Sequence, residues 1–404
     1  MKICKAVSTT VLLLVFFFNQ QSKGQDGTAR IVNSLNDIII PIQTIKPDSN
    51  FDDLGFLKHT LENRNIVSLG EATHGTKEFF LYKVRLTQFL VADLGFKAIA
   101  FESDFSSVQK LDDFINNKVK NLDKGYSGFP LTQQTREMLY WLQNYNATKE
   151  ITDRVHLYGL EARGFDSICA TILNSFSNLP AQNKALLAKI QHATYNALDR
   201  DDVNAVKTII PQLYQSADQN KNSLNRHYIT LLDQAVSQYL DSKYGYRDKF
   251  MADNLAWLHE NTDVKKVIIW AHNGHLSKSP LFGVPSLGTY LYQKYNSKYF
   301  AIATDFNEGS VLVSVPKKDK VDWINKSFPA VRSKNNYEYY FHQCKYPNFM
   351  IDIGSLKDHL ILSPFFSEHM LMRLVGATGE LSKTKLSILG NFDLVVFFNI
   401  TNPS

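Results

Sequence analysis

Histidines and carboxylates that follow short apolar runs are the residues of this sequence best suited to chemistry. Glu71 and His74 stand three residues apart on a glycine-bounded segment, and His272 and His275 have the same spacing. A histidine with a pKa of about 6.5 can take a proton from water near neutral pH, and a carboxylate partner fixes its tautomer and raises its basicity. These pairs therefore indicate acid–base chemistry on a bound water.

Three further carboxylates stand where other apolar runs end, namely Glu102, Glu161 and Asp305. Ligands of open parallel sheets bind outside the carboxyl ends of the strands. We therefore expect these acids to converge with the two histidine-containing segments on one edge of a sheet. For any residue taken singly, the plainer interpretation is that a charged side chain only marks the point where a strand leaves the core.

Two kinds of hydrolytic chemistry fit such a set, and the spacing does not separate them. Histidine could activate water without a metal, or histidine and glutamate could hold a divalent metal. A purely structural role, in which the histidines cap strand ends, also stays open. The segment from Gly70 to Thr76 has the spacing of a phosphate-binding loop but lacks its lysine, and no Gly-x-Ser-x-Gly or Gly-x-Gly-x-x-Gly motif is present. Nucleotide binding and a serine nucleophile are therefore not expected.

The elements that must position these residues alternate between strands and helices. Short apolar runs are typical of strands buried on both faces, and the helical spacing between them, as over 79–94, indicates crossover connections and parallel pairing. The predicted strands are 66–69, 98–101, 155–158, 267–270, 299–303, 348–352, 359–362 and 393–398. Residues 166–261 contain almost no strand pattern and predict a helical insertion. The sequence predicts an α/β fold with a largely parallel or mixed central sheet, flanking helices and this helical lobe.

The chain has 404 residues, of which 44% are hydrophobic, and its first segment is typical of an export signal. Residues 1–24 carry a basic start, an apolar stretch too short for a membrane helix, and small residues before the predicted cleavage point. We expect a periplasmic or secreted protein with an irregular lead-in over 25–50, a main domain over 51–404 and no membrane span after the signal peptide. The formal charge of +5 includes three lysines of the signal segment, so nucleic acid is not an expected partner.

Two segments resemble a known family. Gly-Glu-Ala-Thr-His-Gly-Thr-Lys-Glu over 70–78 and Trp-Ala-His-Asn-Gly-His over 270–275 are similar to the two most distinctive segments of the erythromycin esterases. Other similar pieces follow in order over 96–102, 135–146, 247–254, 288–291 and 300–309. The resemblance extends over about 60–400, nearly the whole chain after the signal segment.

The resemblance implies hydrolysis of the lactone ester of macrolide antibiotics, and thus macrolide resistance, with no metal or cofactor. It assigns His74 as the base that activates water, Glu71 as its partner and Glu102 as an acid that holds the water. The pair His272 and His275 would stabilise the oxyanion or protonate the leaving oxygen. Substrate contacts are expected from three further residues: Lys83, Arg247 and Glu161.

One departure from the family concerns position 83, where members often have arginine and this chain has lysine, which cannot make the same bidentate contact. The expected partner is a small macrolide molecule, and we expect a monomer. Two alternatives stay open: a metal-dependent exported hydrolase or peptidase of related fold, and a non-enzymatic haem-type binder.

Overall fold

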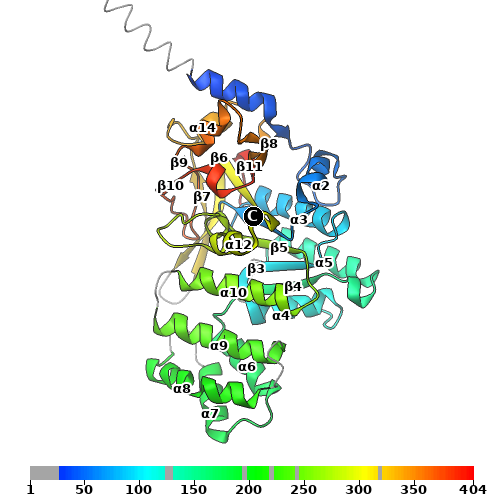
Figure 1. The fold of residues 1–404 in the computed structure, drawn as a ribbon, viewed down its shortest axis with the longest axis vertical. Coiled ribbons are helices and arrows are strands. Elements are labelled where there is room, and N and C mark those ends of the chain that lie inside the picture. The colour runs from blue at the N-terminus through cyan, green and yellow to red at the C-terminus, as the bar shows by residue number, and fades with distance from the viewer. Residues whose placement is uncertain (1–26, 123–130, 193–197, 218–222, 242–244, 317–320) are drawn as a thin grey trace, which may run out of the picture.

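The computed structural model describes residues 27–122, 131–192, 198–217, 223–241, 245–316 and 321–404 (Figure 1). The predicted signal peptide over residues 1–24 lies outside the described residues.

The described residues form a nine-stranded sheet in the order β1-β8-β11-β6-β2-β5-β3-β4, with β7 paired to β6. The strands are β1 (Ile40–Pro41), β2 (Ile66–Glu71), β3 (Ala98–Asp104), β4 (His156–Glu161), β5 (Val267–His272), β6 (Tyr299–Pro316), β7 (Val321–Phe328), β8 (Asn348–Asp352) and β11 (Leu394–Thr401). The six strands from β11 to β4 in this order run parallel, whereas β1, β8 and β7 pair antiparallel. The predicted mixed, largely parallel sheet is confirmed.

The strands are continuous apolar runs because both faces of the sheet are covered. In β5, Val267 and Ile269 belong to one hydrophobic core, whereas Ile268 and Trp270 belong to a second core on the opposite face. Successive side chains of a strand point to opposite faces, so a strand between two cores needs apolar residues at every position. This is the physical reason why the runs contain no polar alternation.

Helices supply the other half of each core. Helices α2 to α5 contribute to the core of Ile268 and Trp270, and helices α6 to α10 and α12 contribute to the other. The helices are α2 (Gly55–Leu61), α3 (Lys77–Ala92), α4 (Phe105–Ile115), α5 (Gln133–Ala147), α6 (Phe165–Ser175), α7 (Ala181–Gln191), α8 (Arg200–Ser216), α9 (Leu224–Leu240), α10 (Tyr246–Asn261), α11 (Asn273–Leu276), α12 (Leu287–Tyr295), α13 (Glu338–Phe341), α14 (Leu362–Ser367) and α15 (Ile388–Asn391). A small separate sheet pairs β9 (Met370–Leu371) with β10 (Lys385–Leu386).

Helices α6 to α10 lie between β4 and β5 in the chain, where the sequence predicts a helical insertion. In Figure 1, α10 crosses beneath the sheet, and α6 to α9 extend beyond it to the end of the molecule opposite the N-terminal helix. The helical lobe of the predicted fold is therefore present. That the lobe is a unit over 166–261 and the main domain runs over 51–404 stays a prediction.

Two local predictions are wrong. Residues 27–38, expected to be irregular, form a helix. Its Leu35 is fully buried and Ile31 packs against the same core, so a narrow apolar stripe suffices to hold a mostly polar segment in a helix. Residues 359–362, expected to be a strand, form a turn that leads into α14. Here His359 Nδ1 accepts hydrogen bonds from the backbone nitrogens of Ile361 and Leu362, which favours a turn over strand pairing.

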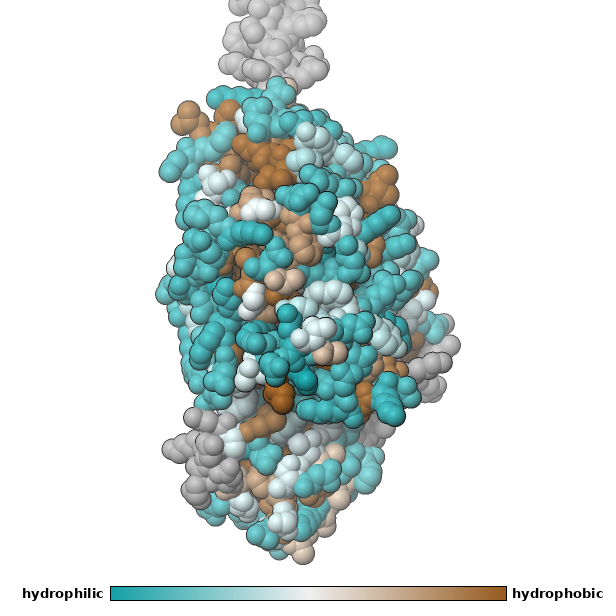
Figure 2. Space-filling view, turned by 90° about the vertical axis from the view of Figure 1, so that its right-hand side faces the viewer, coloured by the Kyte–Doolittle hydropathy of each residue, from teal (hydrophilic) through white to brown (hydrophobic). Residues whose placement is uncertain are grey.

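The two described cysteines are unpaired, and the visible surface is mostly hydrophilic. Cys169 and Cys344 are both free, and burial raises the pKa of each thiol to about 12. Hydrophilic residues dominate the face seen in Figure 2, where the apolar patches are small and separated. Among the described residues, no helix combines the length and the apolar character that crossing a bilayer would require.

Candidate active site

The segment that follows β2 carries the first pair of candidate residues. Glu71 is buried at the end of β2, and its Oε1 lies 2.8 Å from His74 Nδ1. Position 75 requires a glycine, because a Cβ there would collide with the carbonyl of Leu312 in β6. Gly75 also accepts a hydrogen bond of 2.9 Å from the Leu312 backbone nitrogen. The extended strand β6 therefore holds the loop in which His74 faces Glu71.

Lys83 of α3 occupies the second oxygen of Glu71. Its Nζ lies 2.5 Å from Glu71 Oε2 and 4.4 Å from the centre of the Trp270 ring. Burial opposes ionisation of Glu71, but the charge of Lys83 and the hydrogen bond to His74 outweigh it and lower the pKa of Glu71 to about 2. Burial lowers the pKa of Lys83. The carboxylate is thus an ionised acceptor that fixes the orientation of the imidazole.

The sequence predicts a substrate contact for Lys83, and the structure places this residue elsewhere. Its side chain is 1% exposed and does not line the large cavity described below. The reason is the position of α3, which packs on the sheet. The Lys83 amine therefore reaches the Glu71 carboxylate from the side that does not face the large cavity.

Glu102, near the end of strand β3, lies at the centre of a second cluster, which also contains Arg247 and His275. Its Oε1 accepts a 2.7 Å hydrogen bond from Arg247 of α10, and its Oε2 accepts one of 2.8 Å from the backbone nitrogen of His272. Burial opposes ionisation of Glu102, but His275 and Arg247 outweigh it and hold its pKa well below the ordinary value. Arg247 also pairs with Glu161 at the end of β4, so Glu161 lies behind the arginine and does not line the large cavity, where the sequence predicts a substrate contact for it.

His275 lies between two carboxylates. Its Nδ1 is 2.7 Å from Asp248 Oδ1 and its Nε2 is 3.3 Å from Glu102 Oε1. Burial opposes protonation, but the charge of Glu102 and the hydrogen bond of Asp248 prevail and raise the pKa of His275 to about 10. Arg247 Nη1 also lies 2.9 Å from His275 Nε2, a hydrogen bond only for a neutral imidazole. The two carboxylates nevertheless favour the protonated form of His275 near neutral pH.

His272 has a different environment, although it is only three residues away. Its Nδ1 accepts a 3.1 Å hydrogen bond from the Gly274 backbone nitrogen, and its Nε2 lies 3.3 Å from the Ala72 carbonyl oxygen. Burial and the neighbouring His74 lower the pKa of His272 to about 4. Its ring is therefore neutral, with both nitrogens engaged by the backbone. This geometry supports a role in holding the Ala72 segment beside His74.

The three histidines lie close together, as predicted from their positions at the ends of the strands. The ring centres of His74 and His272 are 5.2 Å apart, and those of His272 and His275 are 6.5 Å apart. Burial opposes protonation of His74, but the hydrogen bond to Glu71 and the charge of Glu102 raise its pKa above the ordinary value. The hydrogen bond to Glu71 uses Nδ1 of His74 and leaves the lone pair of Nε2 for water. His74 is thus suited to accept a proton from water.

Asp305 does not join this group, so its predicted convergence is wrong. It is fully buried within β6, and burial together with the charge of Glu338 of α13 holds its pKa well above the ordinary value. The reason is the length of β6, which continues past the ends of its neighbours for many residues. Position 305 therefore lies inside the strand and not at its carboxyl end.

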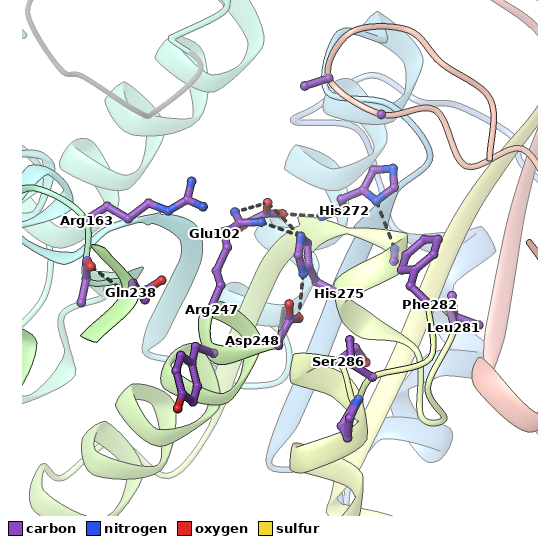
Figure 3. A pocket seen from close by; sticks show the side chains of 18 of the residues that line it. Glu102, Arg163, Gln238, Arg247, Asp248, His272, His275, Leu281, Phe282 and Ser286 are labelled. Atoms are coloured by element: carbon purple, nitrogen blue, oxygen red, sulfur yellow. Dashed lines mark hydrogen bonds and ion pairs between the residues drawn. The ribbon is translucent and has the colours of Figure 1, made fainter. Parts of the chain in front are cut away.

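A cavity of about 620 Å³ opens onto the histidines (Figure 3). His74, His272, His275, Glu102 and Arg247 line its floor. Its walls come from the segment that leads from β4 into α6, the end of α9, the start of α10 and the loop before α12. They include Arg163, Phe165, Gln238, Tyr246, Leu281, Phe282, Val284 and Ser286. A pocket of this size with many apolar walls and a few convergent polar groups is typical of a small-molecule site.

Several of these residues were missed by sequence reasoning. Asp248 binds His275, and Figure 3 shows it directly beside that imidazole, yet nothing in the sequence singles it out except its position next to Arg247. Arg163 and Phe282 lie on loops, where no periodicity exists to predict which way a side chain points. Phe282 lies against Gly274, which explains why it borders the histidine segment.

Within the described part of the chain, no group of three or more His, Cys, Asp or Glu residues is arranged to hold a metal ion. The carboxylates of the site are already paired with cations of the protein, Glu71 with Lys83 and Glu102 with Arg247.

Comparisons with known proteins show the family and the fold. The family described as erythromycin esterase matches residues 91–401. The erythromycin esterase type II of Escherichia coli is 26% identical over 286 residues, which cover 60% of this chain and 68% of that protein. Among solved structures, a succinoglycan biosynthesis protein has a TM-score of 0.82 at 22% identity, covering 93% of this chain and 98% of that one. A mutant of the erythromycin esterase EreC in its open conformation has a TM-score of 0.67 at 18% identity, covering 89% and 96%.

The structural similarities show a shared fold, and the family match extends over most of the chain and includes the second histidine pair. It supports a hydrolase or esterase with a small-molecule substrate. The chain belongs to the erythromycin esterase family.

Proposed function

We propose that this protein hydrolyses the lactone ester of macrolide antibiotics with a water molecule activated by His74. The observation that carries the proposal is the pairing of His74 Nδ1 with Glu71 beside a large cavity. An ionised Glu71 holds the proton on Nδ1, so Nε2 presents a lone pair to water. The curated relative from Escherichia coli carries the name erythromycin esterase, and family membership supports the same substrate class here.

The reaction needs a base, positive charge at the oxyanion and a proton for the leaving oxygen. In the proposed mechanism, His74 takes a proton from water as the water oxygen bonds to the lactone carbonyl carbon. The His275 imidazolium and Arg247, both on the cavity floor, stabilise the negative charge that develops on the carbonyl oxygen. The ring carbon–oxygen bond then breaks, and the proton held by His74 passes to the leaving oxygen. Glu102 keeps the two cations in place.

Mass spectrometry of a macrolide panel tests the proposal. Purified protein should add the mass of one water to at least one macrolide, and a His74→Asn variant should lose activity by a factor of about 10² to 10⁴, as expected for removal of an acid–base group. His59→Asn is the matched control, because His59 lies on α2 with its side chain 92% exposed. Every tested macrolide remaining intact would refute the substrate class, and wild-type turnover by His74→Asn would refute the mechanism.

We also propose that the protein is an exported monomer that protects its host from macrolides. The amino-acid pattern of residues 1–24 supports export. Cell fractionation should find the mature chain outside the cytoplasm, and sedimentation should give the mass of one chain. Expression in a susceptible strain should raise the inhibitory concentration of erythromycin, and the His74→Asn variant should not.

A further inference from the structure

A second, smaller cavity borders on the same histidine. It has a volume of about 50 Å³, and His74 and Glu102 line both this space and the large cavity. We call the smaller space the inner chamber. Glu71 and Thr135 also line it, together with three aromatic side chains described below. The proposed base therefore faces two spaces, of which only one is large enough for a macrolide.

The inner chamber fits water in both size and polarity. A water molecule needs about 10 to 15 Å³ of such space and two to four polar partners. The carboxylates of Glu71 and Glu102, the imidazole of His74 and the hydroxyl of Thr135 are the polar groups of its lining residues. The Thr135 hydroxyl donates its proton to the Thr132 carbonyl oxygen at 3.1 Å, so it offers a lone pair to water.

Glu71 is bonded to Lys83 and His74, and Glu102 is bonded to Arg247, the His272 backbone nitrogen and His275. Because an ionised carboxylate accepts about four hydrogen bonds, each still has a lone pair for water.

The other walls of the chamber are rigid. Phe80, Phe101 and Trp270 line it, and all three belong to one buried core. The Phe101 and Trp270 rings pack edge to face with centres 5.8 Å apart, and Trp270 Nε1 donates a 3.0 Å hydrogen bond to Thr87. Close-packed aromatic rings resist displacement, so the volume of the chamber sets an upper limit on the molecules it can hold.

We propose that the hydrolytic water comes from the inner chamber, where Thr135 helps to position it. The substrate enters from the large cavity and does not bring the reacting water with it. This inference rests on the proposed function. A macrolide that fills the large cavity displaces the water there, whereas the inner chamber keeps its water next to His74. Thr135 is a positioning residue in this scheme, because it acts on the water and not on the ester.

The proposal predicts a second activity with a size limit. Methanol, with two heavy atoms, is small enough to replace water in a chamber of about 50 Å³, whereas benzyl alcohol, with eight heavy atoms, is not. When methanol reacts, its oxygen bonds to the lactone carbonyl carbon, its hydroxyl proton passes to His74, and the ring carbon–oxygen bond breaks. The ring oxygen then takes the proton from His74. The product is a ring-opened methyl ester with a free hydroxyl, so the atoms balance without any further reactant.

Product analysis in water–alcohol mixtures tests this on the wild-type protein. Mass spectrometry should find the methyl ester beside the acid in methanol, and no benzyl ester in benzyl alcohol at equal concentration. Phe101→Ala, which removes one aromatic ring from the chamber wall, should give benzyl ester. Methyl and benzyl esters in equal yield from the wild type would show that the nucleophile arrives through the large cavity and would overturn the proposal.

Variants of Thr135 supply an independent test. Thr135→Ile, which fills the chamber, should lower kcat about tenfold with an unchanged KM, an effect on the scale of a weakened acid–base step. Thr135→Ser, which keeps the hydroxyl and the space, should stay within about twofold of the wild type. Equal kcat in all three proteins would count against the chamber as the source of water.

The inference and the proposed function can fail separately. If macrolides are hydrolysed but the alcohols show no size limit, the inference fails and the function stands. If no macrolide is hydrolysed, a high-resolution crystal structure still tests the inner chamber. Ordered water within hydrogen-bond distance of His74 and Thr135 would support the chamber as a water site, and a dry chamber would overturn the inference.

Discussion

Lys83 Nζ and Glu71 Oε2 lie 2.5 Å apart, and the two side chains are only 1% and 8% exposed. The sequence suggests Lys83 as a substrate contact, but its position makes it the buried counter-ion of the carboxylate that orients His74. A buried ion pair adds little stability by itself, yet removing one partner leaves the other charged and uncompensated. Variants that remove one or both of these charges can therefore separate the structural role of Glu71 from its catalytic role.

Glu71→Gln should lower the free energy of unfolding by about 3 kcal/mol, because it leaves Lys83 buried without a counter-ion. The double variant Glu71→Gln with Lys83→Met removes both charges and should recover most of this loss. Urea denaturation measures both values. Activity should stay about 10² lower in both variants, since the neutral glutamine lacks the negative charge that raises the basicity of His74. A double variant that regained wild-type activity would show that Glu71 only balances the charge of Lys83.

The pH profile of kcat/KM should be bell-shaped. His74 must be neutral to act as a base, and its pKa is raised by Glu71 and Glu102, so activity should rise with pH through a midpoint above 6.5. His275 must stay protonated, and its pKa is about 10, so activity should fall near pH 10.

Asp248→Asn provides the control for the alkaline limb. It removes the carboxylate that hydrogen-bonds His275 Nδ1, so the alkaline midpoint should move to lower pH while the acidic midpoint stays in place. An alkaline limb that does not move would mean that another group loses its proton there.

Arg247→Lys should reduce kcat/KM by about tenfold to a hundredfold, because lysine cannot bridge two carboxylates in the way a guanidinium does. Arg247 bonds to both Glu102 and Glu161. Lys249→Ala on the same helix is the matched control, since Lys249 is half exposed and pairs with Asp253 one turn along that helix. Equal losses in the two variants would point to a general effect on α10 and not on the site.

The stability of the helical lobe should depend on pH through His227 of α9. This side chain is 3% exposed, lies flat on Trp257 with ring centres 3.9 Å apart, and burial lowers its pKa to about 3. The unfolded chain takes up this proton below about pH 6.5, whereas the folded protein does not, so stability falls as the pH drops.

Between pH 7 and pH 5 this one residue should cost about 2 kcal/mol of unfolding free energy. Urea denaturation at the two pH values measures the change. His227→Phe keeps the ring packing without a titratable group and should lose less stability over the same range. Identical pH dependence in the two proteins would exclude His227 as the cause.

The local pattern of this chain sufficed to predict much of the fold. The runs at 66–69 and 267–270 are strands because, apart from Ser68, every residue in them is apolar, as a strand between two cores requires. The same pattern failed at 359–362, where the histidine side chain binds the backbone and stops the strand. It also failed to predict the helix over 27–38, whose apolar stripe is narrow.

The sequence by itself determined which residues could do chemistry, since Glu71, His74, His272 and His275 follow strands that end at one edge of the sheet. Only the tertiary structure decided what each one does. Identical imidazoles acquire a pKa near 4 at His272 and near 10 at His275, because one is held by backbone groups and the other lies between two carboxylates. Those neighbours come from α10 and β3, far away in the chain, and no local pattern records which side chains burial will bring into contact.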